Sequence, residues 1–221
     1  MHSNQIEVYK RTIRLTKEQR AIIIGTLLGD GHLETQDRDR TYRLKIEHSI
    51  KQKEYVDWLY QKLRPLVGAS PRERTDKAGF GASYRSYSFT TYSLGLFRFY
   101  GHQFYPKNGI KVVPKSIRKL LEPLSIAIWY LDDGSFKSNR HKTFIIHSHS
   151  FTQGELKRIQ DALLNKFGIR TTLNRQQYTG KLYWRIYILS ESAYRFLKLI
   201  KPVIDQLPSM KYKLGNTTPK K

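Results

Sequence analysis

Two apolar stretches, AIIIGTLLGDG at residues 21–31 and SIAIWYLDDG at residues 125–134, each end in an aspartate followed by a glycine. Their apolar residues predict buried helices. An Asp-Gly pair after a helix is an ordinary stop signal, because glycine readily takes the left-handed conformation that ends a helix. A helix C-terminus carries partial negative charge, however, so Asp30 and Asp133 both stand where a carboxylate is disfavoured. Two related cases indicate that these carboxylates have a chemical role.

An internal repeat relates the two stretches. HSIKQKE at 48–54 resembles HSFTQGE at 149–155, LFRF at 96–99 resembles AYRF at 193–196, and Lys111 has a counterpart in Lys213. These features and the two Asp-Gly pairs recur in the same order, 97 to 103 residues apart. Self-similarity at a fixed period predicts a duplicated structural unit. We expect a first copy at 1–100, a connection at 101–122, a second copy at 123–214 and a disordered basic tail at 215–221.

Each copy is predicted to have the element order αββαββα, and the fold class is therefore α+β with two pseudo-symmetric copies. In the first copy, periodicity predicts helices at 16–29, 51–66 and 93–100 and strands at 33–37, 42–49, 70–76 and 83–91. The second copy repeats this order, with helices at 123–133, 152–167 and 190–200 and strands at 135–139, 142–149, 169–176 and 182–189. Antiparallel sheets with helices on one face leave the other face free.

Composition indicates the class of partner. The chain has 40 Lys and Arg against 18 Asp and Glu, a formal net charge of +22, which favours a nucleic acid as the neutralising partner. Cysteine is absent, which excludes disulfides and thiolate zinc sites. No apolar run approaches the roughly 18 residues of a membrane span, and no signal core is seen. We therefore expect an intracellular protein with no membrane partner, in an organelle (chloroplast or mitochondrion) or a bacterial cytoplasm.

The predicted strands show what occupies the free sheet faces. In 42–48, Leu44 and Ile46 alternate with Arg43 and Lys45. A solvated face is the ordinary alternative, but the net charge favours a surface that binds double-stranded DNA, with strands reading base edges in the major groove. The candidate DNA-binding residues are Arg43, Lys45, Arg72, Arg74, Arg85, Tyr87, Arg175, Gln177, Arg185 and Tyr187.

The two helices that end in aspartate are natural partners for each other. Gly25 and Gly29 leave a smooth groove on the first helix, and packing about a pseudo-twofold axis would place Asp30 beside Asp133. Two adjacent carboxylates stay ionised only if a cation binds them, and a hard divalent cation such as Mg²⁺ does so. Paired acids between two basic sheets indicate a metal-dependent nuclease. The second helix has an aspartate, Asp132, in place of Gly29, so we expect asymmetric packing with Asp132 turned outward.

Both stretches resemble the signature helices of LAGLIDADG homing endonucleases of the single-chain, two-motif type. IIGTLLGDG and IAIWYLDDG carry the resemblance, and the surrounding pattern agrees from Thr16 to Leu214. The resemblance implies the LAGLIDADG fold, in which the two sheets form a DNA-binding saddle. It also implies a monomeric, site-specific DNA endonuclease that hydrolyses phosphodiesters of a long asymmetric target and leaves 3′ overhangs.

The same resemblance implies roles for individual residues. Asp30 and Asp133 would bind Mg²⁺, with the backbone carbonyls of Gly29 and Asp132 as further ligands, and Mn²⁺ or Ca²⁺ could occupy the same sites. Lys111 and Lys213 would lie near the metals.

Those lysines would polarise water or stabilise developing negative charge, unless they only contact phosphates or solvent. Glu47, and Ser148 through the 101-residue offset, match positions that order solvent near the metals. His147 and His149 could ligate a metal, although the repeat match of His149 to His48 favours a packed, structural histidine.

Two other functions remain open at this level. An RNA maturase that assists splicing would use the same fold and would add the chain's own intron RNA as a partner. A sequence-specific DNA-binding regulator would need no catalysis. The intact Asp30 and Asp133 favour cleavage.

Overall fold

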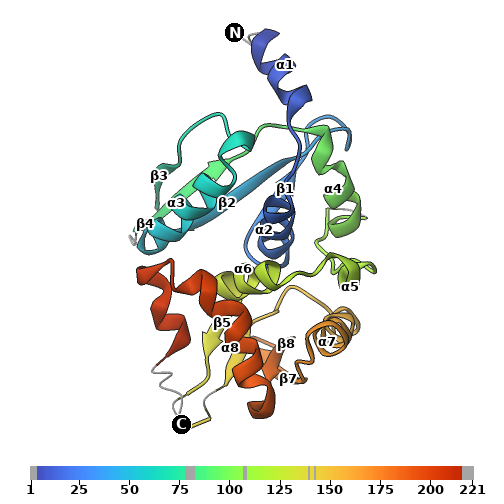
Figure 1. Ribbon diagram of the computed structural model, residues 1–221, viewed down its shortest axis with the longest axis vertical. Coiled ribbons are helices and arrows are strands. Elements are labelled where there is room, and N and C mark those ends of the chain that lie inside the picture. Colours follow the sequence, from blue (N-terminus) through green and yellow to red (C-terminus); the bar gives the residue numbers. More distant parts are fainter. Residues whose placement is uncertain (1–3, 78–82, 107–108, 139, 142, 216–221) are drawn as a thin grey trace. The chain divides into compact units, whose positions relative to one another are not determined.

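The computed structural model describes residues 4–77, 83–106, 109–138, 140–141 and 143–215. Residues 78–82, between the strands predicted at 70–76 and 83–91, and residues 216–221 of the predicted tail lie outside the described residues. The described residues form helices and two antiparallel four-stranded sheets, which confirms the predicted fold class (Figure 1). In the described part of the chain, no helix has both the length and the apolar content needed to cross a membrane.

In the first half of the chain, the described residues form four strands and four α-helices. They are α1 (Asn4–Thr12), α2 (Lys17–Leu28), β1 (His32–Glu34), β2 (Arg43–Ser49), α3 (Lys53–Lys62), β3 (Arg72–Lys77), β4 (Ser83–Thr90) and α4 (Arg98–Phe104), with 3₁₀ turns η1 (Ile50–Gln52), η2 (Arg64–Leu66) and η4 (Gly95–Phe97). The strands form one sheet in the order β1-β2-β4-β3.

The second half repeats this plan. Its elements are α5 (Ile117–Leu120), α6 (Pro123–Asp133), β5 (Gly134–Phe136), β6 (Phe144–Ile146), α7 (Gln153–Phe167), β7 (Thr171–Tyr178), β8 (Lys181–Ile188), α8 (Ser190–Ile204) and the 3₁₀ segment η5 (Pro208–Leu214). The second sheet has the order β5-β6-β8-β7, which matches the first sheet strand for strand. The equal strand orders are the structural form of the sequence repeat.

Contacts divide the chain into two compact units. The first unit comprises the residues up to Arg20 together with Asp30–His102, and the second unit comprises Ala21–Gly29 together with the residues from Gln103 onward. Most of α2 therefore packs within the second unit, although it precedes the first sheet in sequence.

The core of the first unit lies between its sheet and α3, which runs along β2 and β4 (Figure 1). Burial alternates along β2: Leu44, Ile46 and His48 are buried, while Arg43 and Lys45 are only partly covered. This period of two confirms the predicted division of the strand into an apolar and a charged side. Leu33, on β1, pairs with Leu44 and extends the same apolar face.

The second unit has a larger core, formed by α2, α6, α7, α8 and the second sheet. The α6 residues from Ser125 to Leu131 are all buried, as are Ile186 and Ile188 of β8. Helix α7 begins at a capping box, in which the Thr152 hydroxyl accepts from the backbone N–H of Glu155 and the Glu155 carboxylate accepts from that of Thr152. It ends at Gly168, whose φ of 63° is a left-handed C-cap.

The sequence-based boundaries differ from the structure where local chemistry intervenes. The helix predicted at 51–66 is interrupted after Lys62, because Pro65 cannot supply the N–H that a continuing helix needs. The strand predicted at 33–37 stops at Glu34, where Asp37 accepts hydrogen bonds from Thr41 and closes a turn. Helices α1 and α5 and the segment η5 were not predicted.

Candidate functional site

Helices α2 and α6 pack at very short range within the second unit. A Cβ atom added at Gly25 would lie 2.6 Å from both the Ile128 Cβ and the Ser125 carbonyl oxygen. A Cβ atom at Gly29 would lie 2.5 Å from the Asp132 Cβ. Gly25 of α2 and Gly29, which follows the helix, thus each lie against a larger residue of α6, and the predicted asymmetric packing is confirmed. The expectation that Asp132 turns outward is wrong, because its side chain fills the space that Gly29 leaves.

A lysine contacts the backbone carbonyl before each motif aspartate. The Lys111 Nζ donates to the Gly29 carbonyl oxygen at 2.7 Å, and the Lys213 Nζ donates to the Asp132 carbonyl oxygen at 2.9 Å. Both contacts lie inside the second unit. The repeat predicts that the two lysines occupy equivalent places, and the structure gives them equivalent partners.

Lys213 is held more firmly than Lys111. It is buried, with 6% of its surface exposed, and its backbone carbonyl accepts a 2.7 Å hydrogen bond from the Tyr130 hydroxyl. Burial strongly raises the pKa of Tyr130, which keeps that hydroxyl a donor at all ordinary pH values. The phenol therefore fixes the end of η5, from which the Lys213 side chain reaches Asp132.

The two motif aspartates have different surroundings. Asp30 is exposed, and its Oδ2 lies 3.6 Å from the Nδ1 of His48, whose ring packs against Tyr55. One Asp133 oxygen, Oδ2, accepts a 3.1 Å hydrogen bond from the Trp129 Nε1. The two aspartates belong to different compact units, so their expected pairing stays a prediction.

The groups at the ends of α2 and α6 fit a hard divalent cation. Carboxylate and backbone carbonyl oxygens are the ligands that Mg²⁺ and Ca²⁺ prefer. The Gly29 and Asp132 carbonyl oxygens each already attract one cation, an ammonium group. A carbonyl oxygen has two lone pairs, so it can accept from the lysine and still face a metal ion.

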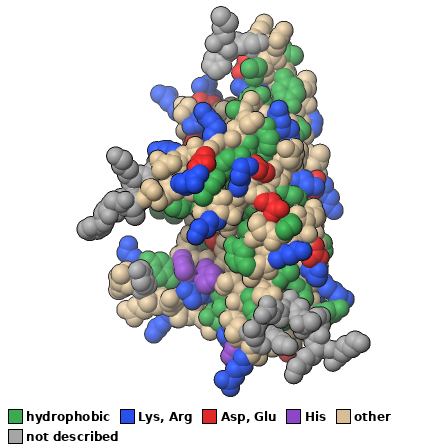
Figure 2. All heavy atoms as spheres, turned by 90° about the vertical axis from the view of Figure 1, so that its left-hand side faces the viewer, with side chains coloured by type: hydrophobic (Ala, Val, Ile, Leu, Met, Phe, Trp, Pro, Cys, Tyr) green, Lys and Arg blue, Asp and Glu red, His purple; other side chains and the backbone are tan. Residues whose placement is uncertain are grey.

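The free face of the first sheet carries cations paired with acids. Arg43 binds Glu34 at 2.8 Å, and Lys45 binds Glu47 at 2.7 Å. The hydrogen bond from Lys45 lowers the pKa of the Glu47 carboxyl, which is therefore ionised at neutral pH. On this same face, Arg72 and Arg74 pair with Ser88 and Ser86 of β4. On the side of the molecule drawn in Figure 2, Lys and Arg side chains lie among Asp and Glu side chains.

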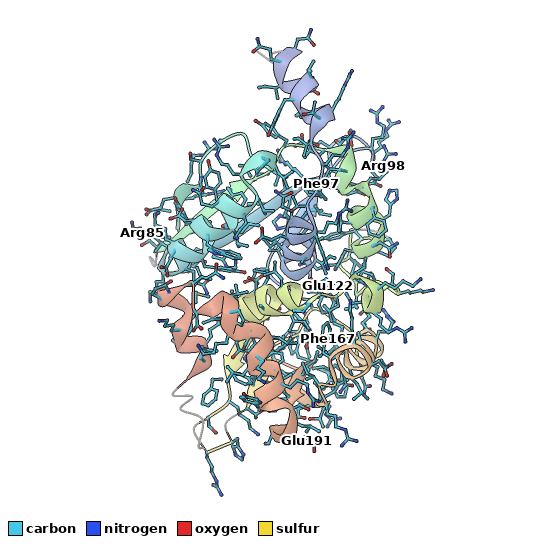
Figure 3. The ribbon with its side chains drawn as sticks, viewed as in Figure 1. Arg85, Phe97, Arg98, Glu122, Phe167 and Glu191 are labelled. Atoms are coloured by element: carbon cyan, nitrogen blue, oxygen red, sulfur yellow. The ribbon has the colours of Figure 1, made fainter. Side chains whose placement is uncertain are left out.

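Two of the predicted DNA-binding residues lie on the opposite face of this sheet. Tyr87 pairs with the buried His48 in the β2–β4 ladder, and its hydroxyl donates to Asp57 of α3 at 3.1 Å. Arg85, two residues away, shares this side and forms an ion pair with Glu73; Figure 3 labels it on β4. The expectation that they line the free face is wrong, because the register gives that face to Ser86 and Ser88.

The second sheet divides its candidates in the same way. Arg185 and Tyr187 lie on the free face, and a nearby ammonium group, Lys137, stands 5.2 Å from the Tyr187 ring centroid. Arg175 and Gln177 pair instead with Trp184 and Leu182, which share the face of the buried Ile186. Placement of Arg175 and Gln177 on the free face is therefore wrong: alternation along β7 gives that face to Asn174 and Gln176, which pair with Arg185 and Tyr183.

The strand register also corrects the match between the two copies. His32 pairs with Lys45, while its counterpart Ser135 pairs with Ile145, so β6 follows β2 at an offset of 100 residues. His147, rather than Ser148, is therefore the counterpart of Glu47. Ser148 is buried and its hydroxyl donates to the Trp184 carbonyl oxygen at 3.1 Å, so it does not reach the free face.

Two histidines lie together on the free face of the second sheet. The ring centroids of His147 and His149 are 5.8 Å apart, and the Arg185 Nε donates to the His149 Nε2 at 3.3 Å. His149 is exposed, so the expectation of a packed, structural histidine is wrong. The His147 Nε2 lies 2.8 Å from the Ser135 hydroxyl. Burial, with Arg185 nearby, lowers the pKa of His147 to about 4.

Comparison with known proteins gives consistent findings. The profile of the LAGLIDADG DNA endonuclease family matches residues 20–196. The chain is 32% identical over 217 residues to the DNA endonuclease I-ChuI of Chlamydomonas applanata, covering 91% of this chain and 96% of that protein. It is also 32% identical over 206 residues to the cytochrome b mRNA maturase bI2 of Debaryomyces hansenii, covering 91% of this chain and 75% of that relative.

A solved structure shares the fold. The homing endonuclease I-WcaI, bound to its DNA recognition sequence, superposes with a TM-score of 0.85 at 24% identity and covers 96% of this chain and 93% of its own.

Proposed function

The chain belongs to the LAGLIDADG DNA endonuclease family, and from this premise we propose that it cleaves both strands of one long, asymmetric DNA target with Mg²⁺ bound at Asp30 and Asp133. The observation that carries the proposal is the pair of equivalent lysine contacts. Lys111 and Lys213 each donate to the carbonyl that precedes a motif aspartate. The same polar contact in both copies is expected when each copy cuts one DNA strand.

The side chains divide the work of hydrolysis. The carboxylates of Asp30 and Asp133 supply the negative charge that holds Mg²⁺, with the Gly29 and Asp132 carbonyls as further ligands. When bound, the metal activates water and stabilises the leaving oxygen. Lys111 and Lys213 hold those carbonyls in place and donate toward negative charge that develops on the phosphate. Water forms the new P–O bond and gives up a proton to solvent, while the P–O bond to one sugar breaks and the released sugar oxygen takes up a proton from solvent.

The free sheet faces provide the binding surface. Arg43, Arg72 and Arg74 lie on the free face of the first sheet, and Arg185 on that of the second. Phosphate contacts supply most of the affinity and base edges the specificity. The two faces carry different side chains, so the target should be asymmetric and a single chain should suffice for both halves.

Maturase activity is the second candidate, because bI2 of Debaryomyces hansenii is named a cytochrome b mRNA maturase. Its partner would be the chain's own intron RNA. The two activities are separable, since splicing assistance needs RNA binding but no DNA cleavage.

The proposal is tested by incubating the chain with a library of randomised DNA duplexes, with Mg²⁺ or with EDTA, and sequencing the cut ends. We expect enrichment of one non-palindromic site, 3′ overhangs and no cutting in EDTA. A site that is bound but never cut would favour a DNA-binding regulator. Intron splicing that depends on the chain, with no DNA cutting, would favour a maturase.

A further inference from the structure

A basic hollow lies in the second unit, between α5 and α7. Its volume is about 420 Å³. The lining includes Lys115, Arg118 and Lys119 around α5, and Arg158 of α7. Asp161 is the one acidic residue of that lining, so four cationic side chains face one carboxylate. Figure 3 shows this part of the second unit, with Glu122 labelled after α5 and Phe167 at the end of α7.

The basic residues on the α5 side of the hollow differ in their ion pairing from those on the free face of the first sheet. There, Arg43 and Lys45 are neutralised by Glu34 and Glu47. Lys115, Arg118 and Lys119 are exposed, and none of the ion pairs within the described residues involves them. Positive charge that exceeds the acidic charge around it attracts an external anion, and here four cations line the hollow with one carboxylate, Asp161.

Among the described residues, Arg158 is the one cation of this lining that is partly held by the protein itself. Its Nη2 donates to the Val113 carbonyl oxygen at 2.8 Å, and Glu155 lies 4.0 Å away. Its Nε is buried, and across the residues that the structure describes it has no hydrogen-bond acceptor. A buried donor without an acceptor loses its hydration for no return. That Nε has almost no exposed surface, so it stays out of reach of a ligand in the hollow, but 38% of the Arg158 side chain is exposed. The exposed part of the guanidinium lines the hollow, and a phosphate oxygen is an acceptor of the kind that arginine binds best.

The hollow does not open on the DNA-binding face proposed above. Leu156, Ile159 and Leu163 are the buried side of α7, and Arg158 and Asp161 lie on its other side. The hollow is therefore part of the helical layer, and Arg185 lies on the free face of the sheet beneath. Duplex DNA has a persistence length of about 150 base pairs, so a duplex along the strands does not fold back onto the helices without a large cost.

We propose that this hollow binds phosphate groups of a second, flexible nucleic-acid strand, separate from the duplex on the sheets. The strand is single-stranded or folded, because only a flexible backbone can place its phosphates in a local hollow while the sheets are occupied. RNA and single-stranded DNA share this chemistry. The inference goes beyond cleavage and does not require it.

The test measures binding of fluorescent single-stranded RNA, and of DNA of the same sequence, to the full chain by anisotropy. Each titration is made with the chain alone and with the chain saturated with a duplex in Ca²⁺. The double variant Arg118→Gln/Lys119→Gln changes exposed residues and should fold. Lys157→Gln/Lys198→Gln removes the same charge from exposed helical positions outside the hollow and is the matched control.

We expect the hollow variant to bind the strand at least about 10-fold more weakly and to lower the salt slope by about 1.4, since each lost single-strand phosphate contact removes about 0.7. The control should change affinity less than about 2-fold, and duplex cleavage should be unchanged in both variants. If RNA binds more strongly than DNA, the strand that the hollow binds is RNA. If the two bind equally, the hollow accepts any flexible nucleic-acid strand.

Equal losses in the two variants would overturn the proposal, as would a duplex that displaces the strand. If the unaltered chain cuts no DNA, the nuclease proposal fails, but this titration still reports on the hollow, because it measures binding alone.

Discussion

The ammonium groups of Lys111 and Lys213 have the most informative contacts of any single residues. Each reaches the carbonyl oxygen that precedes a motif aspartate, at 2.7 and 2.9 Å. A lysine that served only to contact phosphate would extend into solvent, yet Lys213 is buried. Its position fits a role in holding the end of α6 and in meeting charge that develops on the phosphate.

Replacement of either lysine should therefore slow cleavage more than it weakens binding. We expect Lys111→Met to lower the cleavage rate about 100-fold, the usual cost of losing one donor to a developing oxyanion. Affinity for target DNA in Ca²⁺ should change less than about 3-fold, because one cation of many is lost. Single-turnover cleavage and equilibrium binding separate the two effects. Lys157→Met, at an exposed site, is the control, and an equal loss in both variants would contradict the assignment.

The depressed pKa of His147 makes a prediction about pH. The folded pKa of about 4 lies below the ordinary value of 6.5, so the unfolded chain takes up the proton first. Above pH 6.5 His147 is neutral in both the folded and the unfolded chain, and it does not lower the free energy of unfolding. As the pH falls from 6.5 toward 4, only the unfolded chain takes up the proton, and the free energy of unfolding decreases. His147→Gln should therefore show a smaller drop in Tm than the unaltered chain between about pH 7 and pH 5. An identical drop in both proteins would show that His147 does not titrate in this range.

At the scale of elements, the close packing of α2 on α6 determines where the motif residues lie. Gly25 in α2 and Gly29 just after it allow Ile128 and Asp132 of α6 to approach the backbone of this segment. The packing also sets the position of the Gly29 carbonyl, and Asp30 follows in the chain. The buried contact between the two helices thus determines where the polar residues at their C-terminal ends lie.

A methyl group at this contact should be costly. Gly25→Ala would bring Cβ to 2.6 Å from the Ser125 carbonyl oxygen, which is backbone and cannot rotate away. We expect a loss of about 1–3 kcal/mol in the free energy of unfolding, as for other overpacked cores. Gly154→Ala in α7 meets no atom within 4 Å and should be neutral or stabilising by up to about 1 kcal/mol. Denaturant titration of both variants checks this, and equal stability would contradict the tight packing.

Much of the element order followed from the sequence, because period and repeat are local signals. The αββαββα plan and the alternation of Leu44 and Ile46 with charged residues were both confirmed. The register of the strands was harder to predict from the sequence. The sequence match HSIKQKE to HSFTQGE gives an offset of 101, whereas the strand ladders give 100. That single residue moves the counterpart of Glu47 from Ser148 to His147.

The face on which a strand residue lies was harder to predict in strands without a clear row of alternating apolar residues. In RERTDK and TTLNRQQY, the sequence cannot say which side meets the helices, and pairing with β4 and β8 decides it. The register gives Arg72 and Arg74 to the free face and Arg175 and Gln177 to the face that meets the helices. The orientation of Asp132 was also missed, since it depends on the space beside Gly29 in another helix.

At the scale of the whole molecule, the net charge of +22 should make DNA binding strongly dependent on salt. Arg72→Gln/Arg74→Gln on the free face should lower the slope of log K against log salt by about 1.8, since each lost duplex phosphate contact removes about 0.9. Arg85→Gln, on the face of α3, should leave the slope almost unchanged. Binding measured across a salt series compares them, and an equal effect of Arg85→Gln would contradict the assignment of faces.

The central claim is that two aspartates, one from each copy, hold the metal ions that support DNA cleavage. Its most direct test is cleavage of the selected target by the unaltered chain, Asp30→Asn and Asp133→Asn, in Mg²⁺ and in EDTA, with duplex binding measured in parallel. We expect rapid cutting only by the unaltered chain in Mg²⁺, a loss of at least about 1,000-fold in each variant, and retained binding. Cutting in EDTA, or cutting by both variants at the unaltered rate, would contradict the account.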